Sequence, residues 1–114
     1  MNDSELNNFI ELKFILEKNI SFEDLSNIIY NNYENYYYND KNLSNKFYSF
    51  YNLLLESNTD DKLKKNLNLI KRFIDYKLFF NCNHNWINDC IEYGLDNSKC
   101  IRYCNKCFIN DPNY

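Results

Sequence analysis

Two short stretches decide the fold of the last third of this chain: Cys82-Asn83-His84 and, after nineteen further residues, Cys104-Asn105-Lys106-Cys107. They offer three thiols and one imidazole in two close pairs. Structural Zn²⁺ sites take four such ligands in a tetrahedron, at roughly 2.0–2.3 Å. We therefore expect Cys82, His84, Cys104 and Cys107 to hold Zn²⁺ in a closed, structural site, since four protein ligands leave no position for water or substrate.

The segment between the two pairs predicts a β-hairpin. Gly94, the single glycine of the chain, lies in a turn signal between two β-prone runs. Folding about this turn places Trp86 opposite Cys104 and Cys90 opposite Cys100. Side chains alternate along a strand, so two faces are expected. One carries Trp86, Cys90, Cys100 and Cys104 beside the metal pairs; the other carries Ile87, Ile91, Tyr93, Ile101 and Tyr103 and is apolar enough to lie against helices.

Two residues near the expected ligands are candidates for supporting roles. Trp86 could shield the metal from water, or serve simply as a core aromatic residue. Asp89 could accept the second ring N–H of His84 and so fix its tautomer, or be a solvated carboxylate. The remaining thiols, Cys90 and Cys100, are cross-strand neighbours in this register. They are two small buried apolar side chains, a disulfide or redox switch, or a reserve of further ligands for the metal.

Residues 1–80 predict about four amphipathic helices joined by short connections. Apolar residues recur at helical spacing from Leu6 to Leu16, from Leu25 to Tyr37, from Leu43 to Leu55 and from Leu63 to Phe80. Ser4, Ser21 and Thr59 are the expected N-terminal caps, with Ser21 forming a capping box in which Asp24 replaces the usual Glu. Four such helices make a bundle.

Composition and charge exclude several classes of protein. The net charge of −3 and the pI of about 5.1 argue against a general nucleic-acid binder, which usually carries a basic face. No run of eighteen apolar residues predicts a transmembrane helix, and the acidic start predicts no signal peptide. We therefore expect a reducing compartment, in which clustered cysteines favour metal over disulfides. Asn occurs 23 times and Ala, Val and Gln are absent, a bias typical of AT-rich coding sequence.

Enzyme chemistry finds little support in the sequence. His84 is the single histidine and is committed to the metal. One glycine cannot build a phosphate-binding loop. Cys104-x-x-Cys107 has an oxidoreductase spacing, but that chemistry needs a helix N-terminus beside the thiolate, and Pro112 follows too closely for one. We therefore expect no enzyme.

Two clusters could contact a partner. Tyr30, Tyr33, Tyr36, Tyr37 and Tyr38 could stack on single-stranded RNA, although helical spacing predicts core or interface positions for most of them. The fourth expected helix carries a basic run, which is either a solvated face or a contact for nucleic acid. Its members are Lys62, Lys64, Lys65, Lys71, Arg72 and Lys77.

The segment from Cys82 to Cys107 also resembles a known module. It reads Cys-x-His-x-Trp-x-x-Asp and ends in Ile-x-Tyr-Cys-x-x-Cys; the matching positions are Cys82, His84, Trp86, Asp89, Lys99, Ile101, Tyr103, Cys104 and Cys107. This is similar to a C-terminal module of short, mostly uncharacterised proteins of giant nucleocytoplasmic DNA viruses of the mimivirus and phycodnavirus kind. Asn85 and Ile91-Glu92 depart from the usual acidic residue and Ile-Asp pair. The resemblance implies a zinc-bound hairpin and a viral origin, and no activity.

Together these features predict a mainly α protein with a small β appendage. A helical bundle at 1–80 would be followed by a zinc-stapled hairpin at 81–114, similar to a minimal zinc ribbon. The expected function is that of a small non-enzymatic zinc protein, acting as a protein–protein adaptor or structural component in the host cytoplasm, at the virus factory, or in the virion. A nucleic-acid-binding zinc protein and a thiol redox protein are the alternatives, and dimerisation through the Tyr-rich helix is conceivable.

Overall fold

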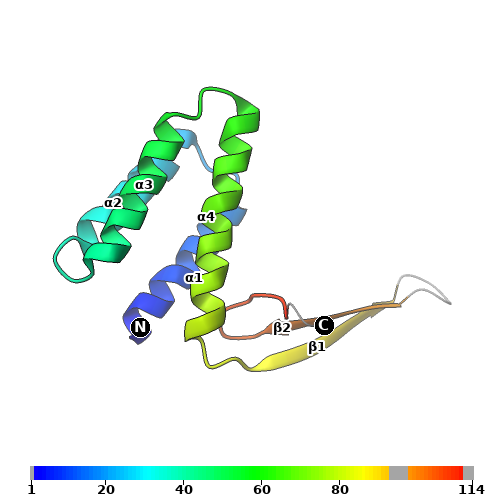
Figure 1. The fold of residues 1–114 in the computed structure, drawn as a ribbon. Helices are drawn as coiled ribbons and strands as arrows, with labels where there is room; N and C mark the ends of the chain where they lie inside the picture. Colours follow the sequence, from blue (N-terminus) through cyan, green and yellow to red (C-terminus); the bar gives the residue numbers. More distant parts are fainter. Residues whose placement is uncertain (1, 93–97, 112–114) are drawn as a thin grey trace. The chain divides into compact units, whose positions relative to one another are not determined.

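The computed structural model describes residues 2–92 and 98–111, with the side chains of 91, 92, 98 and 99 excepted. In these residues four helices precede a two-stranded antiparallel sheet (Figure 1). The elements are α1 (Asp3–Glu17), α2 (Phe22–Tyr36), α3 (Lys41–Leu55), α4 (Asp60–Asn81), β1 (Trp86–Glu92) and β2 (Ser98–Cys104). The prediction of a mainly α protein with a small β appendage is confirmed.

Side-chain caps fix where the helices begin, because the first N–H groups of a helix lack partners within it. Ser21 Oγ accepts from the N–H of Asp24, and Thr59 Oγ1 accepts from that of Lys62, each at 3.2 Å, as predicted. The cap predicted at Ser4 is wrong. The cap lies two residues earlier: α1 begins at Asp3, and Asn2 Oδ1 accepts from the N–H of Glu5 at 2.8 Å.

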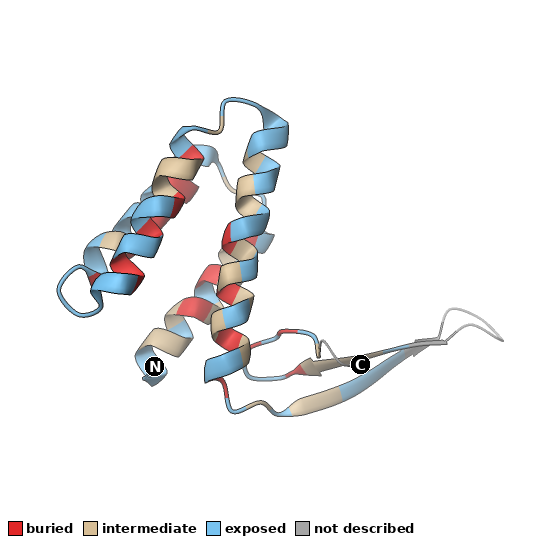
Figure 2. Cartoon of the chain, in the orientation of Figure 1, coloured by how far each residue is buried: buried red, intermediate tan, exposed pale blue. Residues whose placement is uncertain are grey.

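The chain forms two compact units, one of residues 13–73 and one of residues 1–12 with 74–114. In the first unit α2 and α3 lie side by side. Their facing sides bury Ile29, Phe47 and Leu54, and the Tyr36 ring stacks on Phe47 at 5.8 Å. Figure 2 shows the buried positions as stripes along the helices, which is the pattern the apolar spacing predicted.

Two polar side chains connect helices inside this unit. Ser44 Oγ, which is 1% exposed, donates to the Tyr33 carbonyl at 2.8 Å and so links α3 to α2. Asn66 Nδ2 in α4 donates to the Leu53 carbonyl at 3.1 Å and to Ser57 Oγ at 2.7 Å. Ser44 therefore bonds to a residue of α2, and Asn66 bonds to one residue of α3 and to one in the connection that follows it.

The second unit contains parts of two helices as well as the hairpin. It takes in the last two turns of α4 from Ile74, together with the beginning of α1. Ile74 and Leu78 of α4 are buried, as are Cys104, Cys107 and Ile109 of the same unit. The end of the fourth helix therefore belongs with the hairpin.

The hairpin register is the predicted one. Trp86 pairs with Cys104, Asn88 with Arg102, and Cys90 with Cys100. The predicted turn at Gly94 lies outside the described residues. None of the helices among the described residues combines the length and apolar character that a membrane-spanning segment requires.

Candidate metal centre

The four residues predicted as ligands converge on one point of the second unit. The sulfur atoms of Cys82, Cys104 and Cys107 and a ring nitrogen of His84 all lie within 4.8 Å of one another. The Cys82 and Cys104 Sγ atoms are 3.9 Å apart, and Cys107 Sγ is 3.5 Å from His84 Nδ1. Around a tetrahedral zinc the S···S and S···N edges are about 3.8 Å and about 3.6 Å, from the usual bond lengths. The cluster thus has the size of a tetrahedral metal site and could hold a metal ion.

The first ligand pair is positioned by the end of α4. Cys82 directly follows the helix, and its N–H donates to the Leu78 carbonyl at 3.0 Å. His84 then turns back, so that Nε2 lies 2.8 Å from the Phe79 carbonyl oxygen. The last carbonyls of a helix lack partners within it, and the His84 ring supplies one of them.

This contact also settles the tautomer of His84. A carbonyl oxygen only accepts hydrogen bonds, so Nε2 carries a hydrogen, and Nδ1 is the nitrogen that could ligate a metal. Nδ1 is the atom that faces Cys107. The contact with the Phe79 carbonyl therefore orients the ring so that Nδ1 faces the other ligands.

The predicted role of Asp89 in this arrangement is wrong. The Phe79 carbonyl is the partner of Nε2, whereas the Asp89 side chain is exposed. The register explains why: Asp89 is an odd-numbered residue of β1, and alternation places it on the opposite face from Trp86 and Cys90.

The second ligand pair lies in a tight turn after β2. The N–H groups of Lys106 and Cys107 point at Cys104 Sγ, at 3.3 and 3.5 Å. The N–H of Phe108 bonds to the Cys104 carbonyl at 2.9 Å, and Phe108 has φ of 66°. A bulky residue in this left-handed region is uncommon and costs about 1–2 kcal/mol. The turn that directs these two N–H groups toward the sulfur atom therefore contains one strained residue, Phe108.

Asparagine side chains join the two turns to each other. Asn85 Nδ2 donates to Asn105 Oδ1 at 3.0 Å, and the N–H of Asn105 bonds to the Asn85 carbonyl at 3.1 Å. Asn85 follows His84, and Asn105 follows Cys104. This pair of bonds therefore fixes the distance between the two halves of the site.

The thiols differ in acidity. Burial acts to raise the pKa of Cys104, but hydrogen bonds, the largest from the backbone N–H of Cys107, outweigh it and lower the pKa to about 6. Burial raises the pKa of Cys82, and raises that of Cys107 to about 12. Cys104 is thus the first thiolate of the cluster, and a bound cation would displace the protons of the other two, since a coordinating thiol is deprotonated.

Two aromatic rings lie against His84, and one of them also contacts an arginine side chain. The Trp86 ring stacks on His84 at 4.5 Å, and Phe79 lies on its other side at 5.6 Å. The Arg102 guanidinium lies 5.8 Å from the Trp86 ring and forms an ion pair with Asp111 at 3.4 Å. Trp86 is half-buried and stacks on the candidate ligand ring, whereas its predicted role in shielding a metal from water stays a prediction.

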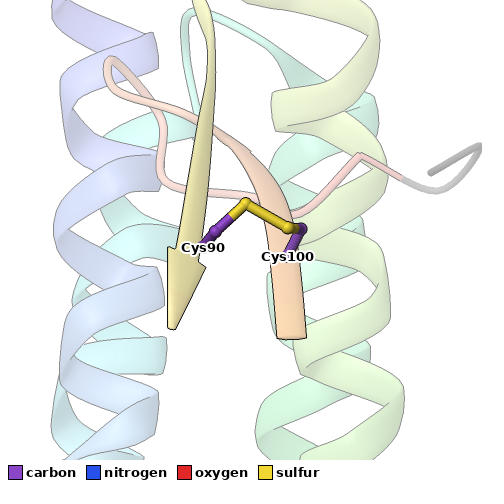
Figure 3. Close-up of a disulfide and its surroundings, with 2 residues drawn as sticks. All are labelled: Cys90 and Cys100. Carbon is purple, nitrogen blue, oxygen red and sulfur yellow. A yellow bond between two sulfur atoms is a disulfide. The ribbon is translucent and has the colours of Figure 1, made fainter. Parts of the chain in front are cut away.

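Cys90 and Cys100 form a disulfide across the hairpin (Figure 3). Cys82, Cys104 and Cys107 are free thiols and are buried, whereas Cys90 and Cys100 are exposed. The interpretation of this pair as two small buried apolar residues is therefore wrong, and the disulfide alternative is the observed one. The pairing follows from the register, which puts the two residues directly opposite each other.

Sequence reasoning missed two contributors to the centre. The Phe79 carbonyl is a main-chain group, so no residue type signals it, although a His three residues after a helix end is a hint. Phe108 occupies a position where Gly is expected, and this removed the usual sign of a left-handed residue.

Comparison with known proteins yields no match for this chain, either to a protein family, to a curated protein or to a solved structure. The arrangement of the four ligands therefore has to be interpreted on its own chemistry.

Proposed function

We propose that this chain is a small, non-enzymatic zinc protein in which the ion staples the C-terminal unit, and that it acts as a protein–protein adaptor or structural component. The observation that carries the proposal is the closed set of three sulfur atoms and one imidazole nitrogen, all within 4.8 Å. Sites of this kind contribute folding free energy. Catalytic zinc sites instead keep a position for water or substrate.

The donor set favours zinc among the divalent metals. Thiolates select zinc, copper(I) or iron–sulfur clusters, whereas magnesium and calcium take oxygen ligands. A tetrahedral S₃N set with one neutral imidazole is typical of structural zinc. The residues present thus fit this ion, and its role would be to hold the end of α4 against the turn after β2.

Exposed aromatic residues support the adaptor role. In the unit that holds the metal centre, Tyr76 and Phe80 are 59% and 64% exposed, and Phe108 is 44% exposed. Tyr76 and Phe80 contact each other, with ring centroids 4.6 Å apart. Aromatic side chains are enriched in protein interfaces and often dominate their energetics.

A viral origin forms part of the proposal. It rests on the resemblance of the Cys82–Cys107 segment to the module of giant-virus proteins. Under this proposal the protein acts in the host cytoplasm or is packaged in the virion. Its partner is another protein, which includes a second copy of the same chain.

The metal assignment is tested by elemental analysis of the purified protein. We expect one equivalent of zinc for the wild type and its loss in Cys107→Ser. The matched control is the double variant Cys90→Ser with Cys100→Ser, which removes two cysteines of the same module and should keep the zinc. Iron in place of zinc, or a metal-free wild type, would overturn the assignment.

The adaptor role needs a separate test. Affinity capture from infected cells should recover a protein partner with the zinc-loaded wild type, and less of it when Phe80 and Phe108 are replaced by Ser. Since both side chains are exposed, the variants should keep their fold. Recovery of nucleic acid without protein would contradict the adaptor role.

A nucleic-acid contact through α4 is the less favoured alternative. At 3.6 residues per turn, the six basic residues between Lys62 and Lys77 spread over roughly two-thirds of the helix circumference. They therefore form no single basic stripe. Affinity for RNA that falls steeply with added salt would revive this alternative.

The exposed disulfide favours a second candidate function, that of a thiol redox protein acting through Cys90 and Cys100. Two thiols would lose two electrons and two protons to form the S–S bond, while a partner disulfide gains them and becomes two thiols. Alkylation after equilibration in glutathione buffers should find two of the five cysteines changing state, with a midpoint in the cellular range of roughly −200 to −300 mV. A pair that stays unreactive across this range would remove this candidate.

A further inference from the structure

A tyrosine pocket lies on the surface of the unit formed by residues 13–73. It has a volume of about 250 Å³ and is lined by Tyr30, Tyr33, Glu34, Tyr37 and Tyr38. All five belong to α2 or directly follow it. Tyr36, the fifth tyrosine of this stretch, is buried in the core instead. The pocket therefore consists of four aromatic rings and a single carboxylate.

Helix α3 supports the rings of this pocket from one side. Tyr51 packs on Tyr30 at 5.1 Å between ring centroids, and Tyr48 packs on Tyr33 at 5.0 Å. Tyr33 also contacts Tyr30 at 5.5 Å and Tyr37 at 5.9 Å. Because several rings hold Tyr33 in place, part of the pocket wall is preorganised before any ligand binds.

The one charged residue that lines the pocket is a carboxylate, Glu34. Residues 19–40 contain four carboxylates, on Glu23, Asp24, Glu34 and Asp40, and no lysine, arginine or histidine. Glu34 is exposed and lines the pocket itself. Thus no cation of this stretch competes for the faces of the tyrosine rings.

The acidity of Tyr33 agrees with this electrostatic character. Burial raises the pKa of its hydroxyl, and the neighbouring Tyr37, Tyr30, Tyr48 and Glu34 raise it further. Among these causes the Glu34 carboxylate is the negative charge present at neutral pH, and a negative charge favours a cation beside the rings. The same unit already uses such a contact, since Lys46 Nζ lies 5.4 Å from the centre of the Phe50 ring.

We propose that the tyrosine pocket binds an alkylated ammonium group carried by a lysine side chain of a partner protein. The ring faces would attract the cation through their quadrupoles, and Glu34 would balance its charge. Alkylation favours binding because it weakens the hydration of the ammonium and enlarges its contact with the rings. The proposal deepens the adaptor role and rests on it for the identity of the partner, whereas the pocket itself is separate from the metal centre.

The test uses the full zinc-loaded chain and four small probes. These are N-acetyl-trimethyllysine methylamide, the unmethylated lysine analogue, a neutral isostere with carbon in place of the ammonium nitrogen, and choline. Ring currents should shift the probe methyl protons upfield in NMR titrations. We expect trimethyllysine to bind about tenfold more tightly than the neutral isostere, and more tightly than choline because its stem also contacts the protein.

Variants assign the binding to the pocket. Glu34→Gln and Tyr37→Leu should each weaken trimethyllysine several-fold, while Tyr37→Phe, which keeps the ring, should restore most of the affinity. Glu34 and Tyr37 are exposed, so these changes should leave the helices intact, as circular dichroism would verify. Tyr76→Leu, an exposed tyrosine outside the pocket, is the matched control and should bind as the wild type.

Several outcomes would overturn the inference. Equal affinity for trimethyllysine and the neutral isostere would mean that the charge is not recognised. Equal or tighter binding of choline would remove the assignment to a protein side chain. Unchanged affinity in Tyr37→Leu would place the binding elsewhere. A failed cation test beside a confirmed protein partner would reject this inference alone, because the adaptor test depends on Phe80 and Phe108.

Discussion

Replacing His84 tests how the metal centre and the end of α4 are coupled. His84→Ala removes both the Nδ1 ligand and the Nε2–H bond to the Phe79 carbonyl. His84→Cys removes only the hydrogen bond to the Phe79 carbonyl, because the introduced thiolate supplies a fourth ligand. The cysteine sulfur takes the place of the ring Cγ, and the longer Zn–S bond recovers part of the lost reach. The two variants therefore separate metal binding from helix capping.

The expected effect on the helix follows from a single hydrogen bond. Nε2 lies 2.8 Å from the Phe79 oxygen, and a neutral bond of this kind is worth about 0.5–1.5 kcal/mol. Metal on Nδ1 makes the ring a stronger donor, toward the charge-assisted range. Losing about 1.4 kcal/mol corresponds to a tenfold change in local opening.

Amide hydrogen exchange of Cys82 is the assay, since its N–H bonds to the Leu78 carbonyl in the same last turn. We expect about tenfold faster exchange in His84→Cys, and a larger increase in His84→Ala, because cobalt titration should show that only His84→Ala also loses a ligand. Unchanged protection of this amide in metal-loaded His84→Cys would refute the coupling. Amides in the middle of α3 serve as the control and should exchange as in the wild type.

Three further predictions follow from single features of the chain. A chelator should abolish the NMR amide dispersion of residues 82–110 and shift the fluorescence emission of Trp86, because the metal-binding free energy is folding free energy for this part of the chain. The amides of α2 and α3 should keep their dispersion. Unchanged spectra would contradict the metal site. Phe108→Gly should bind metal more tightly than Phe108→Ala by about 1 kcal/mol, since only glycine accepts a φ of 66° without strain. Equal affinity of the two variants in chelator competition would show that the backbone at residue 108 is not strained. Asn66→Ala should lower the free energy of unfolding in urea by about 1–2 kcal/mol, because it removes the hydrogen bonds from α4 to the Leu53 carbonyl and to Ser57 Oγ, which still bond to each other. The exposed Asn68→Ala should change it by less than about 0.5 kcal/mol. Similar losses in both variants would argue against a specific role for Asn66.

The hairpin register was predictable because two independent patterns agree on it. A turn near Gly94 and the need to bring both ligand pairs together require the same pairing, Trp86 with Cys104 and Cys90 with Cys100. A slip of one residue would move every side chain to the other face. Local spacing therefore sufficed where chemistry and geometry constrained the same residues.

The sequence predicts which residues share one face of a strand, but it does not predict whether that face is buried. Alternation grouped Cys90 with Cys100, yet it could not say whether they would be buried, and both are exposed. Burial depends on which residues cover that end of the hairpin, which is a tertiary property. Free thiols and a disulfide have the same sequence, so only the three-dimensional arrangement distinguishes the pair from the three ligand cysteines.

The first ligand pair begins one residue after α4 ends, so the helix and the metal centre are directly connected in the chain. His84 then binds the Phe79 carbonyl with one ring nitrogen and faces the other ligands with the second. A residue that caps a helix and also ligates a metal makes the two stabilities depend on each other. The last turns of α4 therefore belong to the metal-bearing unit, although their apolar spacing continues that of the earlier turns of the same helix. A sequence pattern follows periodicity along the chain, whereas a compact unit is defined by which side chains share partners.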